Sequence, residues 1–377
     1  MKRAVGFLAA LVLTVGLVRP CWGVELTLTS HAALLMEKST GEILYAQNEH
    51  DALPPASVTK IMTVLLTMEA IDSGRIALDD MVTVSAYAAG MGGSQVFLAE
   101  GEQMSVDDLL KAVCVSSGND AAVALAEHVA GVTELFVEQM NNRARELGMK
   151  DTHFVNCTGL TAEGHVTSAH DIALMSRELI LHHPDIRRFT TIWMDTIRNG
   201  AFQLANTNKL IRFYDGATGL KTGFTSGAGY CLSASAEREN MELIAVTMGA
   251  ESSKIRNAAC KTLLDYGFAG FALVSPTLEP AQVPVRLGKE AQVEAVLQGE
   301  SSVLIPKAQK AGLTTEIQLE EFCTAPVEKG TVLGTLTLRS GGETLLEVPL
   351  VAAREVKRKT FLDQLVLILR KASMAKG

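Results

Sequence analysis

The stretch Pro54-Pro55-Ala56-Ser57-Val58-Thr59-Lys60 opens an apolar segment that continues to Ile71. This pattern predicts a helix over Val58–Ile71, with Ser57 at its first turn and Lys60 one turn later on the same side. A serine hydroxyl becomes a good nucleophile when a neighbouring base takes its proton, and a neutral lysine can be that base. Ser57 and Lys60 are therefore a candidate catalytic pair, although the spacing S-x-x-K is common by itself.

The segments around this helix predict an α+β fold. Two strands joined by a polar turn precede it, helices continue to about Leu181, and three strands and a last helix follow. The expected elements are strands Ala32–Met36 and Glu42–Ala46, helices Val106–Val115, Ala121–Ala130 and Glu134–Leu147, strands Gly219–Phe224, Gly229–Ala236 and Met241–Met248, and helix Ser252–Tyr266. Strands at both ends with helices between them form a layered structure, so the N-terminal hairpin must lie beside the late strands. We assign residues 24–272 to this domain.

Two further motifs lie within it. Ser117-Gly118-Asn119 interrupts two helical segments, where a loop could hold a hydroxyl and an amide at a cleft. A helix cap with a glycine stop would explain the same residues. Lys221-Thr222-Gly223 falls on a predicted strand, whose alternation directs Lys221 and Gly223 to one face and Thr222 to the other. Gly223, without a side chain, would let a peptide lie against this strand.

The N-terminal segment and the C-terminal third of the chain have sequence patterns that differ from those of this domain. Lys2 and Arg3 precede an apolar stretch and a small-residue site ending at Gly23, which predicts a secretory signal peptide over residues 1–23. Residues 273–352 read as short alternating strands of a small all-β domain. Residues 353–377 combine Lys357-Arg358-Lys359 with apolar residues on one helical face, so we expect a basic amphipathic helix that lies on a membrane surface. Packing of that helix on the β domain or on a partner is the alternative.

Charge and cysteine content exclude several classes. The net charge of −8 offers no general attraction to nucleic acid, and we expect no such partner. Beyond the signal segment, the five cysteines form no C-x-x-C pair, so neither a disulfide framework nor a zinc site is indicated. There is no H-E-x-x-H motif, and the spacing of the histidines at 165, 170, 182 and 183 is not that of metal ligands. We expect no metal and no cofactor.

The three motifs, in this order, resemble those of class A β-lactamases and penicillin-binding proteins. From about Leu26 to the tail the chain resembles the low-molecular-mass penicillin-binding proteins, which are serine D-alanyl-D-alanine carboxypeptidases of the S11 type. Further matching segments are 54–57, 117–121, 154–156, 159–160, 168–171, 208–210 and 263–268. The resemblance implies a penicillin-binding or β-lactamase-like transpeptidase domain, an antiparallel sheet with a helical cluster, followed by the all-β domain and the C-terminal amphipathic helix.

This resemblance also implies roles for individual residues. Ser57 would be acylated, Lys60 would be its general base, and Ser117 with Asn119 would move protons and position the substrate amide. Lys221 and Thr222 would hold the terminal carboxylate of a peptidoglycan stem peptide ending in D-Ala-D-Ala, with Arg256 near it. The backbone N–H groups of Ser57 and Phe224 would form the oxyanion hole. β-Lactams would acylate the same serine, and the enzyme would work outside the cytoplasmic membrane, attached to its outer face.

Some features depart from the family or fit a different activity. Thr218 stands where an acidic residue is frequent, and Cys157 stands where proline is frequent. A class A β-lactamase would need a glutamate that activates water; Glu138 with Asn142 is a candidate, but their segment predicts a solvated helix face. The motifs are also compatible with a D,D-endopeptidase and with a catalytically silent wall-binding protein.

Overall fold

The computed structural model describes residues 26–299, 301–363 and 365. The expected signal peptide and most of the expected amphipathic tail lie outside these residues. Within the described part of the chain, none of the helices combines the length and apolar character that a membrane crossing requires.

A five-stranded antiparallel sheet organises the N-terminal two thirds of the chain. Its order is β2-β1-β9-β8-β7, from β1 (Ala32–Glu37), β2 (Ile43–Gln47), β7 (Ala217–Thr225), β8 (Gly229–Arg238) and β9 (Met241–Ala250). The N-terminal hairpin therefore pairs with the late strands, as predicted, through the ladder from Ala32↔Met248 to Glu37↔Leu243. Because β7 is the last strand in this order, its outer edge faces away from the sheet.

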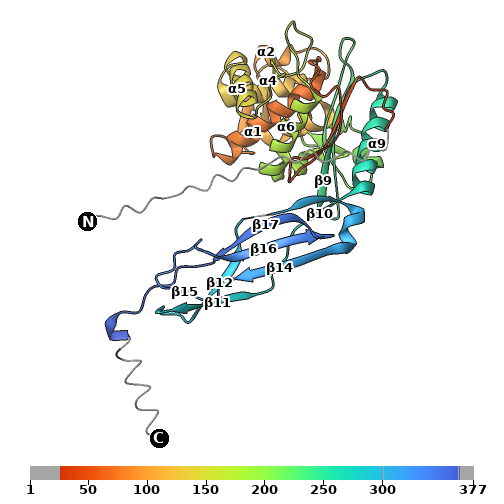
Figure 1. Ribbon diagram of the computed structural model, residues 1–377. Helices are drawn as coiled ribbons and strands as arrows, with labels where there is room; N and C mark the ends of the chain where they lie inside the picture. Colours follow the sequence, from red (N-terminus) through yellow and green to blue (C-terminus); the bar gives the residue numbers. More distant parts are fainter. Residues whose placement is uncertain (1–25, 300, 364, 366–377) are drawn as a thin grey trace, which may run out of the picture.

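The sheet is buried on both faces. Alternate residues of a strand point to opposite faces, so Leu34 and Val246 join one core while Leu35 and Ala245 join another. The first core includes the helical cluster, and the second includes Leu263 and other residues of α9 (Ser253–Gly270). Figure 1 shows α9 on one side of the sheet and α1, α4, α5 and α6 on the other.

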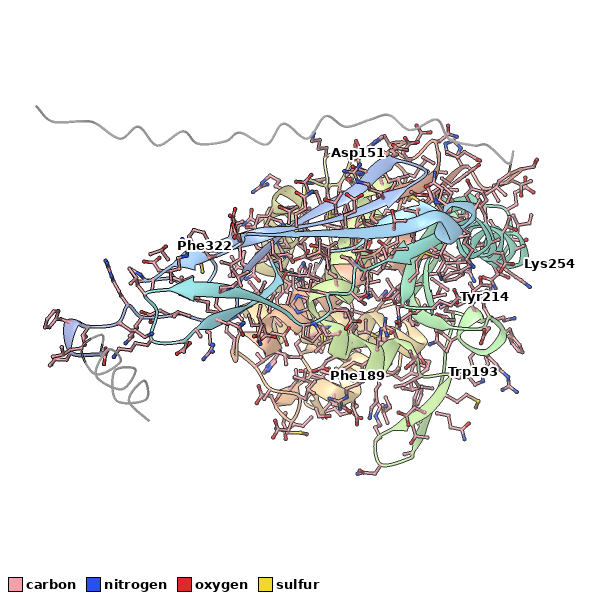
Figure 2. All side chains as sticks on the ribbon, turned by 60° about the horizontal axis from the view of Figure 1, so that its bottom comes forward. Asp151, Phe189, Trp193, Tyr214, Lys254 and Phe322 are labelled. Carbon is pink, nitrogen blue, oxygen red and sulfur yellow. The ribbon has the colours of Figure 1, made fainter. Side chains whose placement is uncertain are left out.

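The helical cluster lies between β2 and β7 in sequence. It contains η1 (Ala56–Thr59), α1 (Lys60–Asp72), α2 (Ala86–Ala89), α3 (Val106–Ser116), α4 (Asn119–Ala130), α5 (Thr133–Glu146), α6 (Ala169–His182), η2 (Pro184–Ile186), α7 (Arg187–Thr190) and α8 (Leu210–Phe213). Two small two-stranded sheets border it, β3 (Met81–Thr83) with β4 (Gln103–Ser105) and the hairpin of β5 (Met194–Ile197) with β6 (Phe202–Ala205). Figure 2 shows Trp193 at the base of the β5–β6 hairpin, which projects from the domain and which the sequence patterns did not reveal.

The all-β region follows α9. A six-stranded sheet in the order β14-β16-β17-β12-β11-β15 contains β11 (Ala281–Arg286), β12 (Gln292–Leu297), β14 (Leu313–Leu319), β15 (Cys323–Thr324), β16 (Val332–Ser340) and β17 (Glu343–Ala352). A separate ladder of β10 (Phe271–Val274) with β13 (Val303–Pro306), followed by η3 (Lys307–Gly312), joins this region to the end of α9. Leu304 of β13 belongs to the same core as Phe268 of α9, so the two regions share apolar contacts. Figure 2 shows Phe322, in the all-β region, far from Lys254 in the first turn of α9.

Candidate active site

Ser57 and Lys60 lie together where the first long helix begins. Ser57 belongs to the 3-10 helix η1, and Lys60 is the first residue of α1. The sequence predicted a helix starting here, and the structure begins it with a 3-10 turn. In the tighter 3-10 turn residues three apart eclipse one another, and Lys60 Nζ lies 3.0 Å from Ser57 Oγ.

Two other groups hold the amine of Lys60, whose side chain is completely buried. Nζ donates to Asn119 Oδ1 at 2.6 Å and to the carbonyl of Thr158 at 2.7 Å. Asn119 presents its oxygen because its Nδ2 donates to the Gly92 carbonyl. A neutral amine has two N–H bonds and one lone pair. With both N–H bonds directed to these acceptors, the lone pair is left facing the Ser57 hydroxyl.

The electrostatics favour that neutral amine. Burial lowers the pKa of Lys60 well below its usual value, and the charge of Lys221 lowers it further. Burial also lowers the pKa of Lys221 to about 7, with the charge of Arg256 acting in the same direction. Two buried ammonium groups that repel one another are costly, so we expect a neutral Lys60 beside a protonated Lys221 just below neutral pH.

The Ser117-Gly118-Asn119 segment joins two helices and faces the same site. Ser117 ends α3 in the left-handed conformation, with φ of 66°, and Gly118 precedes α4. The segment is thus also the helix-capping turn that the sequence allowed as an alternative. The Oγ of Ser117 is buried and has no hydrogen-bond partner among the described residues. A buried hydroxyl left unpaired in this way is available to a ligand or to a proton in transfer.

Lys221, Thr222 and Gly223 lie on β7, at the open edge of the sheet. Their partners on β8 show which way they face, because residues opposite one another share a face. Ser233, opposite Lys221, bonds to Ser176 of the helical cluster, whereas Leu232, opposite Thr222, joins the core under α9. Lys221 therefore points toward the helical cluster, as the alternation predicted. The hydroxyl of Thr222 donates to Thr207 Oγ1 at 2.7 Å, and Thr207 in turn donates its N–H to the Val115 carbonyl of α3.

Gly223 brings β7 against the turn that carries Ser57. A Cβ at this position would lie 2.8 Å from the Pro55 oxygen and 3.1 Å from Ser57 N. The absence of a side chain thus serves contact between strand and nucleophile turn, in addition to any contact with a peptide. Gly159 has a similar use, since a Cβ there would fall 1.8 Å from the Ala56 oxygen.

We expect Gly223→Ala to slow the acylation of Ser57 roughly 10²-fold, because displacements of about 1 Å at a reacting centre have effects of that size. The added methyl group must push β7 away from Ser57. Stopped-flow acylation rates would measure the loss. Gly227→Ala is the matched control, since nothing lies within 4 Å of a Cβ at that position; equal rates in both variants would contradict the prediction.

Phe224 and Arg256 lie beside this strand. The Phe224 side chain is 54% exposed and stacks on Tyr230 with ring centroids 4.3 Å apart. Arg256, in the first turn of α9, is buried with its guanidinium carbon 5.9 Å from the centre of the Tyr230 ring. Its charge influences the pKa of Lys221, so a positive potential extends from Lys221 toward α9.

Several supporting residues carried no catalytic signal in the sequence. Asn156 Oδ1 accepts from the backbone N–H groups of Thr158 and Gly159 and so shapes the loop whose carbonyl meets Lys60. Asp120, next to Asn119, accepts from the backbone N–H groups of Val96 and Leu98 and holds that neighbouring loop. Asn156 lies in a segment that matched the family, and Asp120 follows a site motif. Their functions depend on backbone groups that a sequence does not locate.

The sequence analysis considered several histidines as possible metal ligands and predicted no metal site. Across residues 26–299, 301–363 and 365, no group of three or more His, Cys, Asp or Glu side chains is arranged to hold a metal ion. Glu138 and Asn142 are exposed on α5, where they line a surface pocket with Arg145 and His153. Of the two residues that depart from the family pattern, Cys157 is buried. Thr218 Oγ1 donates a hydrogen bond to Glu242 Oε1 at 2.7 Å.

A sheet with a helical cluster and a serine–lysine pair beside S-x-N and K-T-G segments defines a serine hydrolase of the penicillin-binding class. The family model of D-alanyl-D-alanine carboxypeptidases, peptidase S11, matches residues 22–252, and that of the penicillin-binding protein 5 C-terminal domain matches residues 272–358. The chain belongs to the S11 family of serine-type D-alanyl-D-alanine carboxypeptidases.

Individual relatives agree with this assignment. The chain is 44% identical to D-alanyl-D-alanine carboxypeptidase DacF of Bacillus subtilis over 90% of its own length and 88% of that protein. It is 37% identical to DacC of Escherichia coli, over 88% of this chain and 85% of that one. Among solved structures, penicillin-binding protein 5 from Haemophilus influenzae superposes with a TM-score of 0.74 at 34% identity, covering 88% of this chain and 99% of the other. Penicillin-binding protein D2 from Listeria monocytogenes, in its ampicillin-bound form, has a TM-score of 0.60 at 34% identity, with coverage of 64% and 99%.

Proposed function

We propose that this enzyme removes the terminal D-alanine from peptidoglycan pentapeptide stems through an acyl-enzyme on Ser57. The observation that carries the proposal is the buried amine of Lys60, 3.0 Å from Ser57 Oγ, with two acceptors that leave its lone pair to the hydroxyl. The family supplies the substrate class, since its members are D-alanyl-D-alanine carboxypeptidases.

Lys60 acts as the general base in the first half of the reaction. It takes the Ser57 proton while Oγ attacks the carbonyl carbon of the penultimate D-alanine. The backbone N–H groups of Ser57 and Phe224 stabilise the resulting oxyanion. The proton then passes to the nitrogen of the departing D-alanine, with the unpaired Ser117 hydroxyl as its carrier. In the second half a water molecule gives a proton to Lys60 and attacks the ester. Lys60 then returns this proton to Ser57 Oγ as the shortened peptide leaves, which restores both residues.

The terminal carboxylate of the substrate binds the positive end of the site. Lys221, Thr222 and Arg256 are each more than nine-tenths buried, and Lys221 and Arg256 supply cationic groups there. Charge-assisted hydrogen bonds in such a setting are strong. Asn119 and the edge of β7 hold the peptide backbone, as a strand edge does for an added strand, and Gly223 keeps that edge next to Ser57.

The two lysines give the reaction a bell-shaped pH profile. kcat/KM should rise as Lys60 loses its proton, and should fall as Lys221, with a pKa of about 7, loses the charge that binds carboxylate. Bound substrate carboxylate favours the charged lysine, so the alkaline limb of kcat should lie at higher pH than that of kcat/KM. Rates of D-alanine release between about pH 5 and 10 would measure both limbs. An alkaline limb that stays in place in Lys221→Arg, whose charge is permanent, would assign it to another group.

β-Lactams acylate the same serine. Support comes from the ampicillin-bound structure of the Listeria relative. The β-lactamase alternative has little support, because Glu138 and Asn142 lie on an exposed helix face of α5. A D,D-endopeptidase activity is the second candidate, since a D-alanyl-D-alanine endopeptidase of Pseudomonas aeruginosa is 33% identical over 54% of this chain.

We also propose where the enzyme works. Residues 1–23 direct export, residues 24–272 form the catalytic domain, residues 273–352 form the β-rich domain, and residues 353–377 attach the protein to the outer face of the cytoplasmic membrane. The attachment rests on the basic amphipathic pattern of the tail. Thr360 Oγ1 accepts from Asp363 N, a helix-capping contact, and Phe361 and Leu362 are exposed. Co-sedimentation of the protein with anionic and with neutral vesicles, compared with a variant ending at residue 358, would test it.

The proposed reaction is tested by D-alanine release from diacetyl-Lys-D-Ala-D-Ala. We expect stoichiometric appearance of free D-alanine and, with penicillin, one mass adduct on the peptide that contains Ser57. A cross-linked dimeric muropeptide, offered in parallel, separates carboxypeptidase from endopeptidase action. No D-alanine from either substrate would refute the proposal.

A further inference from the structure

A loop over residues 153–166 packs against the turn that carries Ser57 and Lys60. The bridge between His153 and Val166 closes its base. At its far end, Thr158 offers its carbonyl to Lys60 Nζ at 2.7 Å, and the carbonyl of Cys157 accepts from Thr63 Oγ1 at 2.6 Å. We call residues 153–166 the carbonyl loop. The position of this loop relative to the turn decides where the Lys60 amine points.

His165 connects the carbonyl loop to the turn from inside. The imidazole is 4% exposed, and its Nδ1 accepts from the backbone N–H of Val155 at 2.9 Å. Its Nε2 lies 2.8 Å from Oγ1 of Thr59, the completely buried residue just before Lys60. The ring thus spans the start of the loop and the nucleophile turn. Its hydrogen bonds go to Val155 and Thr59, and not to Ser57 or Lys60.

The hydrogen bond from Val155 fixes the tautomer of His165. A nitrogen that accepts from N–H carries no proton, so the proton of the neutral ring is on Nε2 and is donated to Thr59 Oγ1. Burial, together with the charge of His153, lowers the pKa of His165 to about 4. The ring is therefore neutral at pH 7, with one donor and one acceptor, each matched to one partner.

The loop end keeps its own shape without His165. Asn156 Oδ1 accepts from Thr158 N at 3.1 Å and from Gly159 N at 2.7 Å, and Asn156 Nδ2 donates to the Leu160 carbonyl at 2.9 Å. The carbonyl loop is consequently a preformed unit whose internal bonds do not set its distance from the turn. That distance depends on the contacts at Thr59 and Thr63 and on the close approach of Gly159 to Ala56.

We propose that His165 is a positioning residue for acylation: by linking Val155 to Thr59 it seats the Thr158 carbonyl on one N–H of Lys60, so that the lone pair of the amine faces Ser57. This inference rests on the proposed function. According to this inference, the acylation rate depends on His165, a side chain outside the three motifs, as well as on the motif residues. The Thr59 hydroxyl, between the serine and the lysine of the S-x-x-K motif, is the other half of the link.

Three variants separate the hydrogen-bonded link from simple filling of space. His165→Gln keeps one donor and one acceptor, so acylation by labelled penicillin should stay within about threefold of the parent. His165→Leu fills the site without either group and should lower the acylation rate constant roughly 10- to 100-fold, the size of effect expected from a misplaced catalytic group, with unchanged non-covalent affinity. Thr59→Val should lower the acylation rate constant by a similar factor. His153→Leu, an exposed histidine of the same loop, is the matched control and should acylate at the parent rate.

Coupling and spectroscopy complete the test. Because Thr59 and His165 share one link, the double variant Thr59→Val/His165→Leu should be no slower than the slower single variant. In the parent at pH 7, ¹⁵N NMR of the imidazole should show the Nε2–H tautomer. This measurement needs neither enzyme activity nor a folded variant. A folded His165→Leu enzyme that acylates at the parent rate, a Gln variant as slow as Leu, or an Nδ1–H tautomer would overturn the inference. Should the parent itself release no D-alanine, the proposed function fails, and the tautomer still reports on the link.

Discussion

Ser57→Ala should leave a folded protein that forms no covalent penicillin adduct and releases no D-alanine above background. Without Oγ no ester can form, and the loss should be about 10⁴-fold or more, as for other serine enzymes stripped of the nucleophile. The proposed carboxylate-binding groups Lys221, Thr222 and Arg256 are untouched. Calorimetry should therefore still detect binding of the D-Ala-D-Ala peptide.

Ser73→Ala is a suitable control for this variant. Ser73 ends the same helix, α1, and its hydroxyl contacts only local groups such as the Glu69 carbonyl. It should bind penicillin and release D-alanine at the parent rates. A penicillin adduct in Ser57→Ala, located on the peptide with Ser117, would show that the nucleophile has been assigned to the wrong hydroxyl.

Lys60→Arg should be folded but unable to acylate. The guanidinium remains protonated at every relevant pH, so it has no lone pair for the Ser57 proton. We expect the acylation rate constant to fall roughly 10⁴-fold or more, the upper range for loss of a general base. Because a permanent charge next to Lys221 is also costly, circular dichroism and melting temperature must accompany the rate measurement.

Lys60→Met separates charge from proton transfer. Methionine fills much of the same buried volume without any charge. The Lys60→Met variant should be as inactive as the Lys60→Arg variant. Lys111→Arg is the control, since Lys111 forms ion pairs with Asp107 and Asp108 on α3 and has no part in the site. Acylation of Lys60→Met at the parent rate would mean that another group, such as the Ser117 hydroxyl acting with water, removes the proton.

Much of the fold could be predicted from periodicity. The predictions of α9 and of β7–β9 are correct to within a few residues. These segments are long, regular and bounded by turn residues, so local pattern and tertiary environment agree. The β5–β6 hairpin was missed because its strands are only four residues long and half of their residues are exposed.

The sequence predicted side chains of a candidate site, but not the backbone groups that surround them. Ser57, Lys60, Ser117 and Lys221 stood out because each belongs to a motif. Three backbone features could not be predicted, because they depend on which backbone groups meet after folding. They are the 3-10 turn at Ser57, the position of the Thr158 carbonyl and the close approach of Gly159 to Ala56. From the sequence, His165 is of interest only as a potential metal ligand. Its actual partners, a backbone N–H and a threonine hydroxyl, have no sequence signature.

The pairing of β1 with β9 has a consequence for biosynthesis. Ala32 must find Met248, about 200 residues further along, before the central sheet can close; closure of so long a loop is entropically unfavourable, and contacts of this range slow folding. A nascent chain that has emerged only as far as β8 still lacks the strand on which both β1 and β8 depend. The five-stranded sheet and the two cores on its faces are therefore completed only late in synthesis, after β9 has emerged.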